Sequence, residues 1–474
     1  MAHRSSRGAT YVASLKVFAV IAGLCGAGAS HAAAYPSTYH APAAEYVVLR
    51  GATVLTGTGQ RLNDADVLLG DGLIQAVGQH IDTPAKARVI DARGKWITPG
   101  LIDVHSHLGV AASWQMPSLE DVNERTAPIT ANVWVEHSIW PQDPGFEKAR
   151  EGGVTTLQIL PGSGNLVGGR AVTIKNVAAV TYQAMKFPNA PQGLKMACGE
   201  NPKKNYGSRQ QSPMTRMGNM AVFRQGFAEA QDYRRQRLRY EADLAEYNGS
   251  TNAAKAKPPA EPKRDLRLET LAAVLDGELL VNVHCYRADE MASILDLAQE
   301  FGFKIGTFHH AVEAYKIADL LASSRVCAAM WADWWGFKLE AFDGIQENIA
   351  FVEHAAEGCA IVHSDSAHDV QRLNQEAAKA MFRSSRLGWP IAPECAIRWL
   401  TLNSARALGI ESRTGSLESG KMADVVVWNG NPFSAYALAE RVFIDGAEVF
   451  DRSQRRATPA SDFSLGFSTE ERAL

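Results

Sequence analysis

Strand-length apolar runs recur through the middle of the chain, and no other sequence feature constrains the fold as strongly. Eight of them lie between residues 101 and 365, and helical stretches such as ADEMASILDLAQEFG separate several of them. Runs that are apolar on both faces are typical of parallel strands covered by helices. We therefore expect an α/β fold with a (β/α)8 TIM-like barrel over residues 99–411. The third run, AVTIK, also fits a loop hairpin, so its place in the barrel is open.

The two ends of the chain show a different pattern, in which short alternating runs are punctuated by Gly, Asn and Asp. Such runs predict β-hairpins, and we expect residues 45–98 and 412–452 to form one small composite β-sandwich domain. Residues 216–266 combine a charged helix with an Ala/Lys/Pro-rich flexible stretch. We interpret them as an insertion between the fourth and fifth strands, either a cap over the site or a solvated helix. Residues 453–474 form a tail.

The first 34 residues have the features of a cleaved signal peptide. Early arginines precede an apolar stretch, and the small residues ASHAAA follow at the spacing of a cleavage site. Ser, Lys and Gly interrupt the apolar stretch, so we expect no membrane span in the mature form. The mature protein is expected in the periplasm or outside the cell.

Charge and cysteine content exclude some classes of protein. The formal net charge is −3, and basic blocks with interleaved aromatic residues are absent from the sequence, which argues against nucleic-acid binding. Six cysteines are present, and cleavage of the leader would remove Cys25. The five cysteines that remain are odd in number and widely spaced, so they do not predict a disulfide framework. Most of these cysteines lie in apolar runs, where we expect them to pack as small buried side chains.

The first apolar run of the barrel ends in His-Ser-His. In a β-strand, residues i and i+2 point to the same side, so His105 and His107 would project together. Imidazole nitrogen is a common zinc ligand, although two histidines hydrogen-bonded in a wall of the fold would have the same spacing. Three further polar residues, His284, His310 and Asp365, stand at the ends of later runs, where barrels of this kind place their active sites.

Three stretches resemble the amidohydrolase superfamily, in its imidazolonepropionase-like branch of metal-dependent hydrolases. They are PGLIDVHSHLG, GGVTTLQILPGSGNLVGG and LTLNSARALGIESRTGSLESGKMADVVVWNGNPF, and the resemblance extends from about Tyr46 to Asp451. It implies one or two zinc ions, with other divalent metals as alternatives.

The resemblance also implies roles for individual residues. His105 and His107 would bind a first metal, and His284 and His310 would supply the ligands of the fifth and sixth strands. His310 is preferred to its neighbour because HA-x-E matches the turn of the family. Asp365 would bind metal and act as general base. Asp365 and His310 are the predicted catalytic residues.

The number of metals depends on the fourth strand. Relatives with two metals carry a bridging, carboxylated lysine there, and Lys195 is the best match because it stands inside an apolar run. Some relatives use a glutamate instead, for which Glu200 is the alternative ligand, and Lys175 is a third choice. One metal and two metals both remain open.

Four residues near the expected rim are candidates for substrate binding. Arg287 and Tyr286 follow His284, and an arginine there could hold a carboxylate with both arms of its guanidinium. Arg170 follows the glycine-rich loop, and Trp331 follows the seventh run. Ordinary packing is the alternative for the aromatic residues.

The resulting hypothesis is an exported, metal-dependent hydrolase of carbon–nitrogen bonds. It would use a metal-activated hydroxide on an amide, a cyclic amide or a peptide-like small molecule. The alternatives are a one-metal ring deaminase, an esterase or lactonase, and a non-catalytic periplasmic binding protein. Assembly into a homo-oligomer is an open option.

Overall fold

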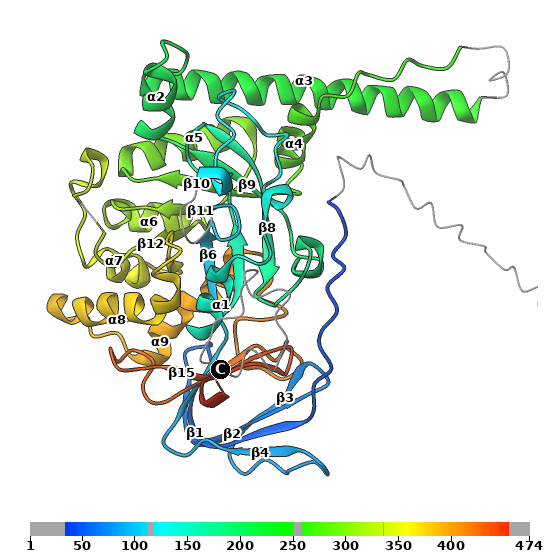
Figure 1. Ribbon diagram of the computed structural model, residues 1–474. Helices are drawn as coiled ribbons and strands as arrows, with labels where there is room; N and C mark the ends of the chain where they lie inside the picture. Colours follow the sequence, from blue (N-terminus) through cyan, green and yellow to red (C-terminus); the bar gives the residue numbers. More distant parts are fainter. Residues whose placement is uncertain (1–33, 112–116, 251–256, 335, 455–474) are drawn as a thin grey trace, which may run out of the picture. The chain divides into compact units, whose positions relative to one another are not determined.

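The computed structural model describes residues 34–111, 117–250, 257–334 and 336–454 (Figure 1). Almost all of the predicted signal peptide and most of the predicted tail therefore lie outside the described residues. All described residues belong to the unit His31–Leu474. No helix in the described ranges is both long enough and apolar enough to cross a bilayer.

An eight-stranded sheet forms the barrel and confirms the predicted fold class. Its strands follow one another in chain order and are almost entirely buried, as the apolar runs require. They are β6 (Leu101–Ser106), β7 (Val154–Ile159), β8 (Val167–Lys175), β9 (Gly193–Ala197), β10 (Leu280–Cys285), β11 (Ile305–His310), β12 (Cys327–Met330) and β13 (Ala360–Val362).

Strand β8 departs from the regular parallel pattern, because it runs antiparallel to both β7 and β9. Only residues 160–166 connect it to β7, whereas a parallel crossover needs a dozen or more residues. The hairpin alternative for AVTIK is therefore the one that the structure adopts.

Hydrogen bonds join the two ends of this sheet. The Ser364 hydroxyl donates to the carboxylate of Asp103, and the Ser364 amide donates to Asp103 Oδ1 over 3.2 Å. The Asp365 amide donates to the His105 carbonyl over 3.1 Å. These bonds hold the segment after β13 against β6, and they fix the backbone of Asp365 beside His105.

Helices lie between and around the barrel strands. Helix α5 shows why they form: Asp289 and Glu290 stand in its first turn, and Gly302 ends it with φ +77°. Its buried residues, which include Met291 and Ile294, recur with helical spacing. The helices are α1 (Pro144–Glu151), α2 (Glu200–Gly207), α3 (Arg216–Gly249), α4 (Leu266–Leu275), α5 (Ala288–Phe301), α6 (Ala318–Ser323), α7 (Asn348–His354), α8 (Leu373–Ser384), α9 (Pro393–Ala396) and α10 (Leu402–Ala407).

Helix α3, which begins the predicted insertion, is one continuous helix of 34 residues (Figure 1). Thr215 caps its first turn by accepting a hydrogen bond from the Gly218 amide over 2.9 Å. All of its buried residues lie between Asn219 and Tyr233. The first half of α3 therefore packs on the protein, and the second half is solvated.

Strands from both ends of the chain form a second sheet, as predicted. The central pairing is antiparallel and joins β5 from the first end to β14 from the second. The strands are β1 (Val47–Leu55), β2 (Arg61–Gly70), β3 (Leu73–Gly78), β4 (Arg88–Asp91), β5 (Trp96–Pro99), β14 (Val425–Trp428), β15 (Ala439–Ile444) and β16 (Ala447–Asp451).

The prediction that the cysteines do not form disulfides is wrong. Cys198 pairs with Cys285, and Cys327 pairs with Cys359, whereas Cys395 is free. The partners are 87 and 32 residues apart in the chain, but each pair bridges neighbouring strands of the barrel. Sequence spacing does not report this proximity, because strand order brings the sulfur atoms together.

Candidate active site

Most of the predicted metal ligands lie at the carboxyl ends of barrel strands. His105 is on β6, Lys195 on β9, His284 on β10 and His310 at the last position of β11. All four side chains are buried. The two remaining predicted ligands, His107 and Asp365, directly follow β6 and β13.

The carboxylate of Asp365 lies among three imidazoles. Its Oδ1 is 3.5 Å from Nε2 of His105 and 3.3 Å from Nε2 of His107. Its Oδ2 is 3.9 Å from Nε2 of His310. The structure therefore brings four of the predicted ligands together around one point.

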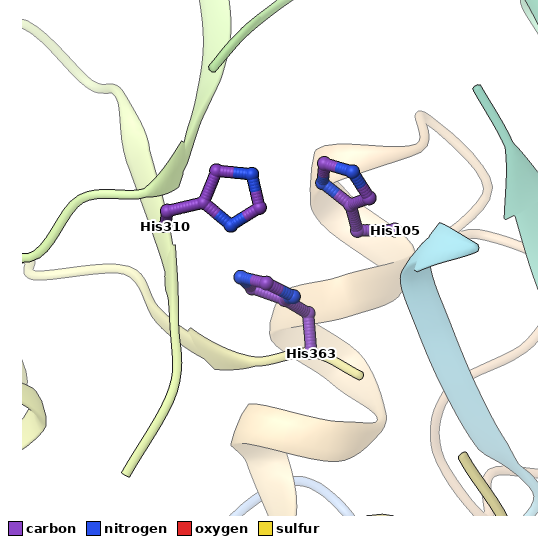
Figure 2. A group of neighbouring side chains, drawn as sticks. All are labelled: His105, His310 and His363. Atoms are coloured by element: carbon purple, nitrogen blue, oxygen red, sulfur yellow. The ribbon is translucent and has the colours of Figure 1, made fainter. Parts of the chain in front are cut away.

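Two groups of side chains in the described part of the chain could each hold a metal ion. One is His105, His107 and Asp365, and the other is His105, His310 and His363 (Figure 2). Within each group, one ligand atom per residue lies within 4.8 Å of the others. The second group contains His363, which the sequence analysis did not single out, although it lies two residues before Asp365 in VHSD.

The backbone is strained where it presents two of these residues. His310 has φ +70°, the following Ala311 has φ +36°, and Asp365 has φ +51°. Non-glycine residues in this region cost about 1–3 kcal/mol each and persist where surrounding contacts hold them. At the end of β11, both His309 and His310 contact the imidazole of His105, which a regular strand would not allow for consecutive residues.

A hydrogen-bonded chain sets the tautomer of His105. Asn282 Nδ2 donates to the Leu280 carbonyl over 3.1 Å, so its Oδ1 accepts from Nε2 of His309, also over 3.1 Å. Burial holds the pKa of His309 and of His105 well below the usual value, so both rings are neutral. His309 Nδ1 must then accept from Nδ1 of His105 over 2.9 Å. This leaves the Nε2 lone pair of His105 free to bind a metal.

A hydrogen bond to the backbone gives His107 the same tautomer as His105, with the proton on Nδ1. Its Nδ1 donates to the Leu160 carbonyl over 2.8 Å, so Nε2, the atom near Asp365, carries the lone pair.

Lys195 is buried inside the barrel, 1% exposed. Its Nζ donates to the Pro161 carbonyl over 2.9 Å, and burial lowers its pKa to about 8 despite the nearby charge of Asp365. The charge of Lys195 contributes to the lowered pKa of His105 and His310.

The two rivals of Lys195 are placed differently. Glu200 begins α2, lies 3.8 Å from Lys338 Nζ and belongs to neither group of potential ligands in the described residues. Lys175 forms ion pairs of 3.0 Å with Asp424 and 2.8 Å with Asp445. It lies at the opposite end of the barrel, because β8 runs antiparallel and Lys175 pairs with residue 156 near the start of β7.

His284 is buried, but it belongs to neither group of potential ligands within the described ranges. Its ring centroid is 4.6 Å from that of His310. However, its Nε2 accepts a hydrogen bond from Asn201 Nδ2 over 3.3 Å. Asn201, in the first turn of α2, therefore occupies the His284 nitrogen that a metal would need.

Two of the four candidates for substrate binding lie beside the site. The rings of Tyr286 and Trp331 stack on His310, with centroid distances of 5.3 and 4.3 Å. Trp331 also donates to the Ser364 carbonyl over 3.2 Å. Burial, with the charge of Asp365, raises the pKa of Tyr286, which therefore stays a neutral hydroxyl.

The two arginine candidates are engaged elsewhere. Arg287 is partly exposed and places both arms of its guanidinium on Asp289, at 2.9 and 2.8 Å. Arg170 is buried in the barrel wall on β8, where it donates to Thr270 over 3.0 Å and to Gln192 over 2.8 Å. Burial lowers the pKa of Arg170 to about 10. Protein partners already occupy both guanidinium groups, and the two substrate roles stay predictions.

Lys338, which the sequence analysis missed, lies close to Tyr286. Its Nζ is 4.0 Å from the centroid of that ring and donates to Asn201 Oδ1 over 3.1 Å. Burial lowers the pKa of Lys338. No sequence signal marks this residue, since it stands in an irregular loop after β12 and reaches the site only through the fold.

A cavity of about 630 Å³ adjoins His363. Its wall includes Trp331, His363 and Ser364, together with Arg372 and Arg383 near the two ends of α8. It therefore offers space for a small molecule next to the potential ligands.

The residues present fit a divalent metal. Nδ1 of His310 and both ring nitrogens of His363 are buried without a hydrogen-bond partner among the described residues. Such groups cost about 1–3 kcal/mol each when nothing satisfies them. Imidazole nitrogens and a carboxylate are the donors that zinc and related metals take.

Comparison with known proteins identifies the family. The model of the amidohydrolase family matches residues 345–455. The crystal structure of an amidohydrolase from Thermotoga maritima MSB8 is 35% identical, with a TM-score of 0.75, over 86% of this chain and 100% of that chain. The chain belongs to the amidohydrolase family, and this membership indicates a hydrolase acting on carbon–nitrogen bonds.

Two further relatives agree with the resemblance seen in the sequence. The amidohydrolase tasK of Hapsidospora irregularis is 32% identical over 402 residues, which are 81% of this chain. The chain spans only 40% of the length of that relative. An imidazolonepropionase of Symbiobacterium thermophilum is 26% identical over 404 residues, which cover 78% of this chain and 86% of the relative.

Proposed function

We propose that this protein is a metal-dependent amidohydrolase that hydrolyses a carbon–nitrogen bond in an amide, a cyclic amide or a peptide-like small molecule. The observation that carries the proposal is the position of Asp365, whose carboxylate lies 3.3–3.9 Å from Nε2 of His105, His107 and His310. A carboxylate among imidazoles is the donor set of a hydrolytic metal centre.

His105, His107, His310 and Asp365 would hold the metal, with Lys195 beside them. A divalent metal would lower the pKa of its bound water to about 7 and polarise a carbonyl oxygen. The chain of hydrogen bonds from Asn282 through His309 presents the lone pair of His105. Tyr286 and Trp331 pack on His310 and exclude water from one side of it.

Asp365 is suited to accept and return a proton. Burial favours its neutral form, but the contact with the imidazole of His107 and the charge of Lys195 outweigh this effect. The pKa of Asp365 is therefore held below its usual value, and the carboxylate is ionised at neutral pH. It can take a proton from the attacking water at a carboxylate oxygen and deliver it to the leaving nitrogen.

We also propose that the protein is exported. The leader-like first 34 residues support this, and so do the two disulfides, since disulfides persist in oxidising compartments and are rare in the cytosol. Cell fractionation with N-terminal sequencing of the mature protein tests the proposal. An intact leader on a cytosolic protein would refute it.

The catalytic proposal is tested with purified protein, the Asp365→Asn variant and a panel of dipeptides, N-acyl amino acids and cyclic ureides. The variant keeps the shape of the side chain but cannot act as a base, so we expect kcat to fall at least 100-fold. Equal activity of Asp365→Asn and the parent, or full activity of the parent after metal removal, would contradict the proposal.

A further inference from the structure

His363 is a fully buried histidine beside the predicted ligands. It directly follows β13, two residues before Asp365, and is 0% exposed. Its ring centroid is 5.2 Å from that of His105, 5.0 Å from that of His310 and 5.0 Å from that of Trp331. Two imidazoles and one indole thus surround His363, which is not among the predicted ligands.

The hydrogen bonding of the His363 ring differs from that of three other histidines at the site. His105, His107 and His284 each have a ring nitrogen in a hydrogen bond. Neither ring nitrogen of His363 has such a partner in the part of the chain that the structure describes. Buried polar groups in native proteins are almost always satisfied, so a group outside the polypeptide is needed here.

The geometry around His363 suits a metal ion. Ligand atoms of His105, His310 and His363 lie within 4.8 Å of one another, so a point between them lies at most about 2.8 Å from each. Zinc–nitrogen bonds are about 2.0–2.1 Å long, and small ring rotations would close the difference. Figure 2 shows the three rings on different sides of one shared space.

Asp365 can complete this set. Its carboxylate oxygens are 3.5 Å from Nε2 of His105 and 3.9 Å from Nε2 of His310. Adjacent donors in a tetrahedral zinc site are separated by roughly 3.4 Å, given the bond lengths above. His105 has only one free nitrogen, because its Nδ1 is bonded to His309. A metal on this nitrogen can be completed either by His107 or by His310 and His363.

We propose that His363 is a metal ligand, and that it takes the place of His107 in the set named above, which gives a site of three imidazoles and one carboxylate with His105, His310 and Asp365. The proposal rests on the metal dependence proposed above. Three nitrogen donors favour zinc, cobalt, nickel or copper over the harder magnesium, calcium and manganese. The site therefore selects its metal as well as holding it.

The test uses the full-length protein, stripped of metal with a chelator and titrated with Zn²⁺ or Co²⁺ alone. His363→Gln is compared with the parent and with the control His354→Gln. His354 is an exposed residue on α7 that stacks on Trp389. Competition with a chromophoric chelator measures affinity, the visible spectrum of bound Co²⁺ reports its ligands, and plasma mass spectrometry counts the metal.

We expect His363→Gln to weaken Co²⁺ and Zn²⁺ binding at least tenfold and to change the Co²⁺ spectrum, with His354→Gln unchanged. Affinity within twofold of the parent and an identical spectrum would overturn the proposal. A crystal structure of the zinc-loaded parent should place a ring nitrogen of His363 about 2.0–2.1 Å from the metal, and this measurement decides the matter if His363→Gln does not fold. A parent that binds no metal would contradict the proposed function itself, whereas a metal bound equally well without His363 contradicts only this inference.

Discussion

Replacing Asn282 by leucine should weaken metal binding, although Asn282 is not itself a predicted ligand. Its Oδ1 accepts the proton on Nε2 of His309, and this bond obliges His309 Nδ1 to accept from His105. Without the amide, His309 can shift its proton to Nδ1 and donate it to His105. Nε2 of His105 would then carry a proton, and its lone pair would be lost to the metal.

The magnitude follows from the burial of this chain of hydrogen bonds. Asn282 is 1% exposed and His309 is 0% exposed, so a donor left without a partner costs about 1–3 kcal/mol. Partners that orient metal-binding histidines typically contribute 10–100-fold to metal affinity. We therefore expect Asn282→Leu to weaken Zn²⁺ binding by roughly 10–100-fold.

Asn282→Asp is the matched control, because it keeps an acceptor at the same position. It loses the donor to the Leu280 carbonyl and buries a charge, so it should lower the melting temperature. Its zinc affinity should nevertheless stay closer to that of the parent than the affinity of Asn282→Leu. Both variants are titrated against a zinc chelator after their circular dichroism has been checked. A folded Asn282→Leu variant that binds zinc within twofold of the parent would refute the assignment of tautomers.

Three other predictions concern stability. Replacing Cys198 and Cys285 by serine opens a loop of 87 residues, which should cost roughly 4–5 kcal/mol in urea unfolding; an unchanged midpoint and slope would contradict this. Metal at 100 times its Kd should stabilise the fold by about 2.7 kcal/mol, so a chelator should lower the melting temperature reversibly, and identical melting curves would count against binding. Arg170→Met should lose about 1–3 kcal/mol, because Arg170 holds buried polar partners. Zinc affinity should not change in Arg170→Met, and Arg287→Met, at a partly exposed position, should alter neither quantity; a loss of zinc in either variant would support a role in the site.

The sequence by itself was sufficient to predict the barrel and to propose the first candidate ligands. Alternation between strand-length apolar runs and helices is a local property, since neighbouring residues decide which faces of an element are buried. His105 and His107 could be paired in advance because a strand places residues i and i+2 on one side. Asp365 could be proposed because it stands at the end of the last apolar run.

The tertiary structure decided everything that depends on strand order, strand direction and backbone strain. Cys198 meets Cys285 because β9 and β10 are neighbours, although 87 residues separate them. Lys175 lies far from the ligands because β8 runs antiparallel. Both His309 and His310 contact His105, because the positive φ of His310 breaks the regular alternation of the strand. Contacts across the sheet are set by register and direction, and no short stretch of sequence contains that information.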